Sequence, residues 1–421
     1  MSSKTRKKIN FVLLALVVLV IFTLTNLVFS ENGLDEKTKI NLTNKANSLD
    51  RDEVFVDYSA FKSFKSIHHL EAYKNFKTAI DLKAKYTKFH GSVLVAYRDQ
   101  IIFQESYGFK NPVNKTSLRS DTSFELASVS KQFTAAAVLM LAEENCLDID
   151  APVANYLPDF KFESVSIRQL LKHRSGLWDY MYITEAFWNK SYAPNNQEVV
   201  KLISAHQRHL NFTPGSRFNY NNSNYVVLAA LVEKVSGISF ENFLGERILD
   251  SLCLNDTYIG LPHRAIDFVA NAFIGYGRGY VNLPPSFHNR ALGDKGVYAS
   301  STDLFRWFIA LKNNKVLSKD YVELMFNQDE FDTYKYGMGF RTKYTNTKEP
   351  VIYHNGIWDG YRNGLSYFPQ DDLVVIVLSN TQNRRKKYMQ NKLIKEAKAF
   401  INQPNVVQNL SSRKKEKELV L

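Results

Sequence analysis

The chain is organised around the segment 124–137, which reads FELASVSKQFTAAA. From Val129 onward the apolar residues recur at helical spacing, so the segment predicts a helix with one face packed inward. Ser128 and Lys131 are at positions i and i+3 and would lie on the same face of that helix. A buried amine can lose its proton and accept one from a serine hydroxyl. Ser128 is therefore a candidate nucleophile and Lys131 a candidate base.

The spacing of these two residues is not specific by itself. The same Ser-x-x-Lys spacing occurs in three polar, charge-rich surroundings, at Ser59 and Lys62, Ser411 and Lys414, and Ser412 and Lys415. None of those pairs has an apolar helical pattern behind it, and we interpret them as chance matches. The pair Ser128 and Lys131 needs partners from elsewhere in the chain before it indicates an active site.

Composition limits the class of protein. A chain of 421 residues that is 45% hydrophobic and 13% aromatic can bury a large core, in one large domain or two intimate ones. The net charge of +12 comes partly from basic clusters near both ends, which favour a membrane surface over nucleic acid, although solvated basic ends would look the same. Cys146 and Cys253 show no metal-ligand spacing, and a single disulfide between them stays open.

An almost unbroken apolar run covers residues 11–29 and follows a basic segment. The pattern predicts an uncleaved transmembrane anchor with the N-terminus in the cytoplasm, and the alternative is a signal peptide cleaved near Ser30. We therefore expect residues 1–30 to be the basic segment and anchor, and residues 31–60 a polar linker. Residues 61–402 would form the main domain, and residues 403–421 a charged tail.

Strand and helix patterns follow one another in a distinctive order within the main domain. A helical stripe at 70–82 precedes a hairpin at 92–104, and strands are expected at 336–341, 351–354, 364–368 and 374–378, before a last helix at 385–401. The region at about 121–311 is mainly helical with long loops, with helices at 167–171, 197–209, 225–235 and after a cap at Ser301. This order predicts one sheet built from both ends of the domain, with a helical region inserted.

A second stretch with the character of a site is 213–222, which reads TPGSRFNYNN. Pro-Gly makes a turn, and Tyr220 and Asn222 follow just before a predicted helix. A phenol can relay a proton, and an amide can bind a lysine or a substrate carbonyl. The alternative is an Asn-rich loop that only caps the helix.

The third stretch is His354-Asn355-Gly356-Ile357, at the end of a predicted strand. Glycine would let a substrate lie against the strand backbone, and the amide of Ile357 could donate to an oxyanion. The alternative is that His354 is a structural histidine with its hydrogen bonds satisfied.

These three stretches in this order resemble the serine β-lactamase and penicillin-binding-protein superfamily, in its class C β-lactamase, D-alanyl-D-alanine carboxypeptidase and esterase branch. Residues 125–131 look like its first motif, Tyr220-Asn221-Asn222 like its Tyr-x-Asn motif, and His354-Asn355-Gly356 like its His-x-Gly motif. The resemblance covers about residues 88–380. It implies an α/β (α+β) fold of the β-lactamase/transpeptidase type, with an antiparallel sheet flanked by helices.

The resemblance also implies a mechanism. Ser128 would form an acyl-enzyme, Lys131 and Tyr220 would share proton transfer, and which of the two is the base is left open. Asn222 would orient Lys131, and His354 would belong to the catalytic set. The amides of Ser128 and Ile357 would form the oxyanion hole, and Asn355, Gly356 and Ile357 would line the substrate site.

The third motif bears on the substrate class. His354-Asn355-Gly356 stands where many relatives carry Lys-Thr-Gly or Lys-Ser-Gly, whose cation and hydroxyl would bind a substrate carboxylate. A histidine is only partly charged near neutral pH, so weak or absent β-lactam hydrolysis is expected. A second departure is Gly293-Asp294-Lys295-Gly296, where relatives have a glycine-richer turn, so the pocket wall should differ.

We expect a serine hydrolase at the bacterial cytoplasmic membrane, single-pass and with its catalytic domain outside, or a secreted enzyme if the leader is cleaved. Its partner would be a small ester, amide or peptide, such as a cell-wall peptide with D-amino acids. No cofactor, metal or nucleic acid is expected. The alternative from another class is a non-hydrolytic penicillin-binding or sensor module that keeps the scaffold.

Overall fold

A computed structural model of the protein describes residues 67–260, 267–276, 279–327, 335–382, 386–406 and 408. The expected anchor at 11–29, the expected linker at 31–60 and most of the expected charged tail at 403–421 lie outside these residues. Among the described helices, none combines the length and the apolar character needed to cross a membrane.

The main sheet has six antiparallel strands in the order β10-β11-β12-β13-β1-β2. Its strands are β1 (Gly91–Tyr97), β2 (Gln100–Tyr107), β10 (Arg341–Tyr344), β11 (Pro350–Trp358), β12 (Tyr361–Phe368) and β13 (Leu373–Ser379). Strand β1 pairs with β13 along its whole length, from Gly91 opposite Ser379 to Tyr97 opposite Leu373. The prediction of one sheet built from both ends of the domain is confirmed.

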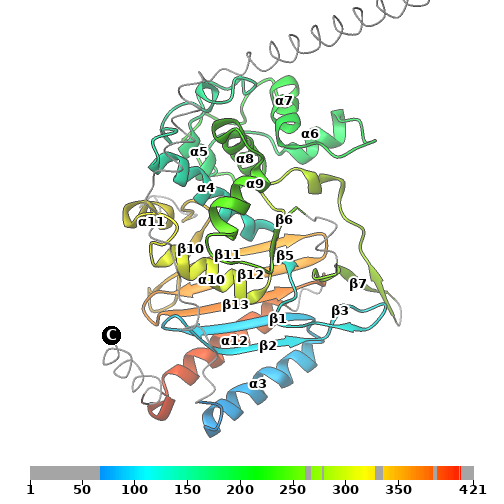
Figure 1. Ribbon diagram of the computed structural model, residues 1–421, viewed down its shortest axis with the longest axis vertical. Helices are drawn as coiled ribbons and strands as arrows, with labels where there is room; N and C mark the ends of the chain where they lie inside the picture. The colour runs from blue at the N-terminus through cyan, green and yellow to red at the C-terminus, as the bar shows by residue number, and fades with distance from the viewer. Residues whose placement is uncertain are drawn as a thin grey trace, which may run out of the picture. The chain divides into compact units, whose positions relative to one another are not determined.

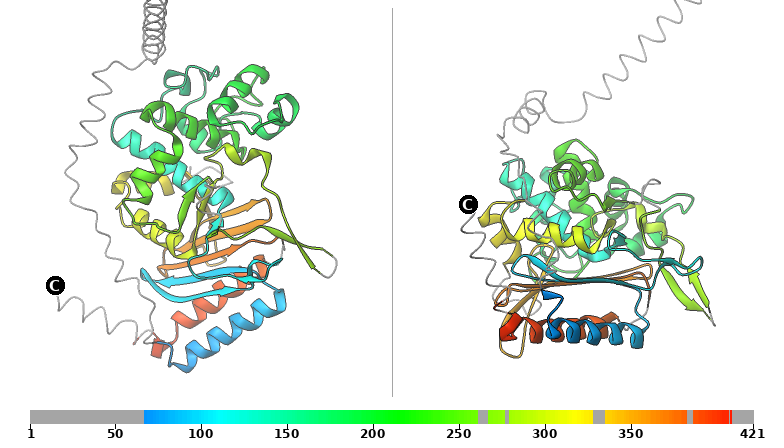
Figure 2. Two further views of the ribbon diagram at one scale, coloured as in Figure 1. Left: turned by 45° about the vertical axis from the view of Figure 1, so that its right-hand side comes forward. Right: turned by 60° about the horizontal axis from the view of Figure 1, so that its bottom comes forward.

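Two long helices cover one face of this sheet, α3 (Glu71–Thr87) and α12 (Lys386–Ile401). Figures 1 and 2 show both helices side by side beneath the strands. The rings of Phe76 in α3 and Phe400 in α12 stack with centroids 5.2 Å apart, and both helices bury their apolar stripes against the sheet. This layer forms a core of its own, separate from the core around the helical region.

The inserted region packs on the opposite face of the sheet (Figure 1). Its helices are α4 (Lys131–Glu143), α5 (Ile167–Leu171), α6 (Tyr180–Phe187), α7 (Asn196–His206), α8 (Ser223–Ser236), α9 (Phe240–Leu244), α10 (Ser301–Lys312) and α11 (Lys319–Phe326). Short helical turns are η3 (Ala127–Ser130), η4 (Val153–Asn155), η5 (Gly245–Leu249) and η7 (Phe287–Arg290). Helices α4 and α8 are buried on nearly all sides, and Phe133 of α4 stacks on Trp307 of α10 at 4.2 Å.

Local sequence explains where several of these helices begin and end. Asn195 and Glu198 form a reciprocal capping box at the start of α7. Gly237 ends α8 in the left-handed conformation, with φ +77°. Helix α10 differs from expectation in that Ser300, and not Ser301, is its N-cap, with its hydroxyl accepting from the amide of Asp303 at 3.1 Å.

Smaller sheets hold the loops around the domain. The strands are β3 (Phe109–Asn111) with β4 (Thr116–Ser117), β5 (Phe124–Glu125) with β9 (Val297–Ala299) and β6 (Thr257–Ile259), and β7 (Phe273–Tyr276) with β8 (Gly279–Asn282). The pairing of β5 with β9 fixes the entry to the segment that carries Ser128. The β7–β8 hairpin projects from the body of the domain in Figure 2.

Two sequence predictions need correction or completion here. The expected strand at 336–341 is wrong for most of its length, because β10 begins only at Arg341 and Tyr336 makes a single bridge to it. Gly339 has φ +79°, which interrupts the extended conformation of a strand before Arg341. Cys146 and Cys253, both in the described part of the chain, are not joined by a disulfide.

Candidate active site

Ser128 lies in a short 3-10 turn directly before α4, and not within the α-helix that its spacing predicts. The residue before it, Ala127, has φ +53°, in the left-handed region that an alanine rarely adopts. A backbone strain of this kind costs about 1–3 kcal/mol and needs support from its surroundings. Support comes from the buried Glu125, whose Oε1 accepts from the amides of Ala127 at 2.9 Å and Gly296 at 3.0 Å.

Lys131 is fully buried at the first residue of α4. Its Nζ lies 3.2 Å from Ser128 Oγ, 2.9 Å from Asn222 Oδ1 and 2.8 Å from the main-chain oxygen of Asp294. An ammonium has three donors, and these three acceptors use them all. After loss of one proton, the nitrogen could accept the proton of Ser128, which is the geometry expected of a serine and its base.

Asn222 is the N-cap residue of α8, yet its side chain makes no capping bond. Its amide oxygen instead accepts from Lys131. An Asn at this position would ordinarily satisfy the free amides of the helix start, so the side chain serves Lys131 at the expense of the cap. Capping alone, which was the alternative for this stretch, does not account for the side chain of Asn222.

Tyr220 lies beside Lys131, with Nζ 5.1 Å from the centre of its ring. Its hydroxyl is buried and, among the described residues, has no hydrogen-bond partner. A buried hydroxyl without a partner is costly, and such groups gather at functional sites. The phenol is therefore free to bond to a group that enters the site.

His354 in β11 is buried and neutral. Its Nδ1 lies 2.8 Å from the main-chain oxygen of Asn355, which can only accept, so Nδ1 carries the proton and Nε2 accepts from the hydroxyl of Tyr336 at 3.3 Å. Burial, with the charges of Lys131 and Arg341, lowers the pKa of His354 well below its ordinary value. The expectation of a partly charged histidine is therefore wrong, and both ring nitrogens already have partners.

Strand β11 passes directly against the turn that carries Ser128. A Cβ on Gly356 would lie 2.1 Å from the main-chain oxygen of Leu126, so only glycine fits there. The side chain of Ile357 is 62% exposed, which leaves its main-chain amide as its contribution to a site. Asn355 points the other way, and its Oδ1 accepts from Lys386 of α12 at 3.2 Å.

His173 braces the loop before α8 from within the same cluster. Its Nδ1 accepts from the amide of Asn221 at 3.2 Å and lies 2.9 Å from Nδ2 of Asn224. Burial, with the charges of Lys131, Arg341 and His354, lowers its pKa well below the ordinary value. His173 thus stays neutral beside Tyr220, whose ring centroid is 4.3 Å away.

Comparison with known proteins bears on this geometry. A family model described as Beta-lactamase matches residues 80–399. The chain belongs to the Beta-lactamase family. Penicillin-binding protein 4* of Bacillus subtilis (strain 168) is 30% identical over 325 residues, which are 73% of this chain and 72% of that protein. Protein flp of Staphylococcus aureus (strain MW2) is 24% identical over 300 residues, 69% of this chain and 59% of flp.

Solved structures of the same fold are similar to this Beta-lactamase-family chain. FmtA from Staphylococcus aureus has a TM-score of 0.66 and 25% identity, and the match covers 78% of this chain and 90% of FmtA. D-amino acid amidase from Ochrobactrum anthropi SV3 has a TM-score of 0.67 and 19% identity, with 77% and 99% covered. The expected superfamily, its fold and an enzyme of the serine-hydrolase class are confirmed.

Sequence reasoning missed one charged residue of this Beta-lactamase-family site. Arg341, the first residue of β10, places its guanidinium carbon 4.6 Å from the ring centre of Tyr220 and 5.4 Å from that of Tyr336. Its charge also acts on His354. The site therefore has a fixed cation after all, from the neighbouring strand. No motif marks Arg341 in the sequence, and only the pairing of β10 with β11 brings it there.

Glu125 and a nearby cavity complete the surroundings. Burial raises the pKa of Glu125 to about 7, against the opposing effect of its hydrogen bonds to Gly296, Ala127 and Tyr298. A cavity of about 120 Å³ is bordered by Glu125, Tyr298 and Trp358, the residue after Ile357. Ser128 does not line this cavity.

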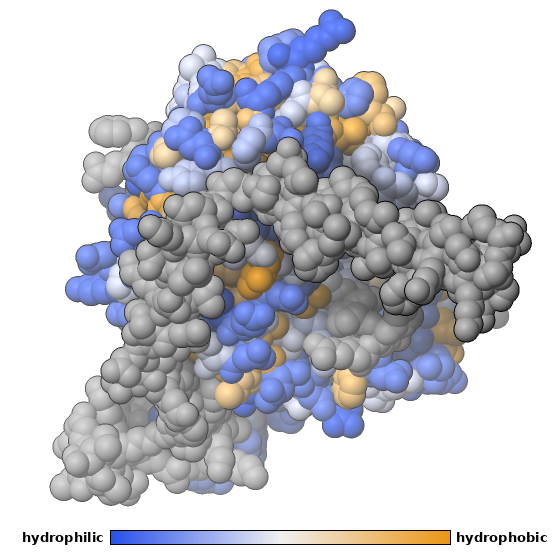
Figure 3. Space-filling view, turned by 45° about the horizontal axis from the view of Figure 1, so that its top comes forward, coloured by the Kyte–Doolittle hydropathy of each residue, from blue (hydrophilic) through white to orange (hydrophobic). Residues whose placement is uncertain are grey.

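Two further observations concern the surface and the possible metal ligands of the described residues. On the face shown in Figure 3, the described surface is mainly hydrophilic with scattered apolar patches, as for a surface in contact with water. Within the described ranges, no group of three or more His, Cys, Asp or Glu side chains is placed to hold a metal ion.

Proposed function

We propose that the protein hydrolyses an ester or amide through an acyl-enzyme on Ser128. The observation that carries the proposal is the position of Lys131 Nζ, 3.2 Å from Ser128 Oγ and bonded to Asn222. Lys131 would take the proton of Ser128 as Oγ attacks the substrate carbonyl. Tyr220, whose hydroxyl has no partner among the described residues, would then give a proton to the leaving group.

The choice of base rests on geometry at the resting site. Lys131 is within hydrogen-bond distance of Ser128, and the Tyr220 hydroxyl is not bonded to it. We therefore assign attack to Lys131 and protonation of the leaving group to Tyr220. In deacylation, water would attack the acyl carbonyl and lose a proton to the Tyr220 phenolate. Lys131 would return its proton to Ser128 Oγ as the acid leaves, so that both groups regain their starting state.

The oxyanion would be held by main-chain amides. Ser128 and Ile357 lie on the two segments that meet at Gly356, where β11 touches the nucleophile turn. Two amides from different segments are a common way to stabilise the tetrahedral intermediate. His354 would shape this wall through its bonds to Asn355 and Tyr336, and would not act as an acid.

Arg341 suggests a substrate with a carboxylate. Its guanidinium lies against the Tyr220 ring and would bind a carboxylate in a bidentate manner. We propose a peptide that ends in a D-amino acid, such as a cell-wall peptide, as the substrate class. A similar structure is named D-amino acid amidase, and a relative is named penicillin-binding protein 4*, which supports this class.

The proposed setting is the outer side of a bacterial cytoplasmic membrane. The apolar run at 11–29 would anchor the chain, and residues 31–60 would link it to a domain at 61–402, with a charged tail at 403–421. We keep the prediction of weak or absent β-lactam hydrolysis, because neutral His354 and Asn355 replace the cation and hydroxyl of the Lys-Thr-Gly motif and the Arg341 cation comes from a different strand. A secreted form is the outcome if the leader is cleaved.

A fluorophosphonate probe tests the nucleophile directly. Wild-type protein should become covalently labelled, and Ser128→Ala should not, while its circular dichroism spectrum stays the same. Labelling that persists in Ser128→Ala would refute the assignment.

Turnover is then measured by intact mass with p-nitrophenyl acetate, nitrocefin and an acyl-D-Ala-D-Ala peptide. Rapid deacylation of the acyl-enzyme formed from the peptide or the ester supports a hydrolase. An acyl-enzyme that persists for hours with every substrate would instead indicate a penicillin-binding or sensor module.

A further inference from the structure

The loop 293–296, in which the Asp294 oxygen accepts from Lys131, also holds a second buried lysine, Lys295. Gly293 and Gly296 have φ +99° and +97°, and the two residues between them, Asp294 and Lys295, have side chains that are 2% and 3% exposed. A Cβ on Gly293 would lie 2.4 Å from the main-chain oxygen of Tyr225, so the loop presses against α8. Two opposite charges are therefore enclosed within the wall of the site.

The loop is fastened to the nucleophile segment by its main chain. The hydroxyl of Thr134 donates to the Gly293 oxygen at 2.7 Å, and Lys131 donates to the Asp294 oxygen at 2.8 Å. The amide of Val297 donates to Ser130 Oγ at 3.1 Å. The position of Lys131 Nζ thus depends on where the main chain of Asp294 lies.

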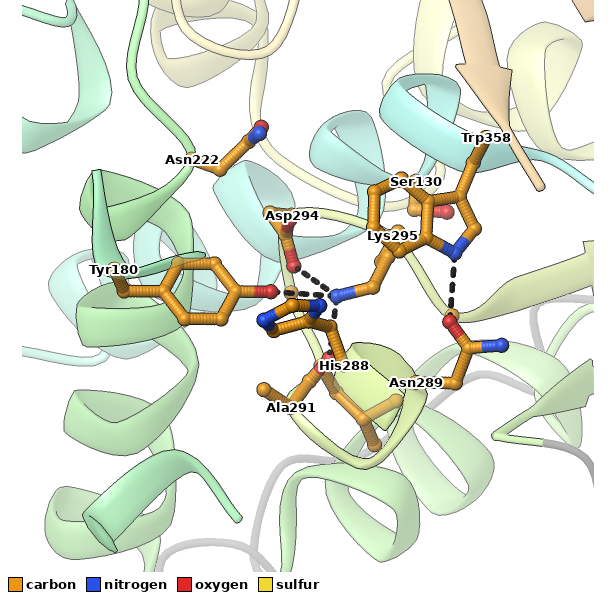
Figure 4. Close-up of polar contacts among 12 residues, drawn as sticks. Ser130, Tyr180, Asn222, His288, Asn289, Ala291, Asp294, Lys295 and Trp358 are labelled. Carbon is orange, nitrogen blue, oxygen red and sulfur yellow. Dashed lines mark hydrogen bonds and ion pairs between the residues drawn. The ribbon is translucent and has the colours of Figure 1, made fainter. Parts of the chain in front are cut away.

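Lys295 has its own three acceptors, shown in Figure 4. Its Nζ donates to the hydroxyl of Tyr180 at 2.7 Å, to the main-chain oxygen of Ala291 at 3.1 Å and to Asp294 Oδ1 at 3.2 Å. Nζ also lies 5.0 Å from the centre of the Trp358 ring. All three donors of the ammonium are used, so Lys295 has none left for a substrate.

The carboxylate of Asp294 is the group that needs this cation. It belongs to the residue whose main-chain oxygen already contacts Lys131, and its charge reaches Asp179, whose pKa is raised chiefly by burial and further by Asp294. Tyr180 bonds to Asp294, and burial with the charges of Asp294 and Asp179 raises the Tyr180 pKa well above its ordinary value. Tyr180 therefore remains a hydrogen-bond donor.

We propose that Lys295 is a positioning residue that keeps the buried Asp294 carboxylate paired, and so keeps Lys131 able to act as a base. Without Lys295, the unpaired carboxylate would act on Lys131, whose Nζ donates to the main-chain oxygen of the same residue, and would hold the proton on it. The inference rests on the proposed function, because it takes Lys131 as the base.

Other titratable or charged groups face the same region and are present in every variant. The titratable or charged groups around Lys131 and Lys295 are Asp179 and Tyr180 at α6, Tyr220 and Tyr225 at α8, His173, Glu125, His288, Arg341 and His354. Because all variants keep these groups, the pH profiles of the variants can be compared directly.

The test is the pH dependence of the second-order rate of fluorophosphonate labelling, measured on the full chain. In wild type the labelling rate should rise with pH, and we call this part of the pH profile the rising limb. In Lys295→Met the rate at neutral pH should fall about tenfold, and the rising limb should shift to higher pH by about one unit or more. In Asp294→Asn the rising limb should move down, because Lys295 then has no counter-charge and its positive charge favours loss of the proton from Lys131. The double variant Asp294→Asn/Lys295→Met should return towards the wild-type profile.

Structural damage would give a different pattern. It would slow all three variants alike, and the rising limbs of Lys295→Met and Asp294→Asn would not shift in opposite directions. Lys312→Met is the matched control, because it removes a largely buried lysine that pairs with Asp99 and Asp372 away from this loop. It should lower stability and leave the limb in place.

Two results would overturn the inference. One is a wild-type pH profile in Lys295→Met, and the other is a double variant displaced as far as Lys295→Met alone. If Lys295→Met does not fold, the Asp294→Asn variant alone is the test. Its asparagine can still accept from Lys295, so it should fold, and the rising limb of its pH profile should lie at lower pH than in wild type. A wild-type profile would overturn the inference. Absence of labelling in wild type would instead count against the proposed function.

Discussion

Replacing Glu125 with glutamine should change how the stability of the protein depends on pH. Both amides that bind Glu125, from Ala127 and Gly296, donate to the same oxygen, Oε1. A glutamine oxygen can accept both, so Glu125→Gln keeps the support of the strained turn at Ala127. The substitution removes the ability to ionise, and it also changes the hydrogen bond between residue 125 and Tyr298.

The magnitude follows from the pKa of this group. Burial raises the pKa of Glu125 from 4.5 to about 7 in the folded protein. Between these values the unfolded chain gives up the proton and the folded chain keeps it, so the carboxyl costs stability as pH rises. Each pH unit of difference is worth about 1.4 kcal/mol, so wild type should lose about 2–3 kcal/mol between about pH 5 and about pH 8 relative to Glu125→Gln.

Urea unfolding of both proteins at these two pH values measures the effect. Glu241→Gln, at an exposed position of α9, is the control and should follow wild type throughout. Equal pH dependence of wild type and Glu125→Gln would show that Glu125 ionises in the folded protein as it does in water. The reasoning about its burial would then be wrong.

Three further substitutions test other parts of the structure. Burial lowers the pKa of Lys386 to about 7. Between about pH 7 and about pH 9 the unfolded chain keeps the proton on this lysine and the folded chain does not, so the unfolding free energy of wild type should rise by about 2 kcal/mol relative to Lys386→Met. Urea unfolding measures this, and an equal pH dependence of the two proteins would contradict it. Gly356→Ala should cost about 1–3 kcal/mol in thermal unfolding and slow fluorophosphonate labelling, because its Cβ meets the oxygen of Leu126; wild-type values for both would mean that β11 stands farther from the turn. Arg341→Met should lower kcat/KM about tenfold or more for a peptide with a free carboxylate and leave that for its C-terminal amide unchanged; an equal loss for both substrates would remove the carboxylate role.

The patterns that sequence could predict were those with strong local causes. The alternation and apolar runs of β1 and β13 predicted a sheet from both ends of the domain. The apolar spacing behind Ser128 and Lys131 predicted a buried segment, and the two side chains do meet. Asn222 was marked by its place between a turn and a helix.

Other features of the site depend on tertiary contacts that leave no local mark. Ala127 takes a left-handed conformation because Glu125 and β11 enclose it, and alanine gives no signal for that. Arg341 joins the site only through strand pairing. Asn355 faces α12 because neighbouring residues of a strand point to opposite faces, which fixes its direction once Gly356 is known to face the turn.

The pairing of β1 with β13 also constrains the order in which the protein can form. Gly91 lies opposite Ser379, so the two strands of the pair are 288 residues apart along the chain (379 − 91). Contacts between such distant residues must overcome a large loop-closure entropy, which makes folding slow. The turn that carries Ser128 likewise packs against Gly356, so this contact cannot form before β11 has been made. A growing chain on the ribosome would therefore hold Ser128 and Lys131 long before it could use them, and activity would arrive late, as a single step, with the last strands.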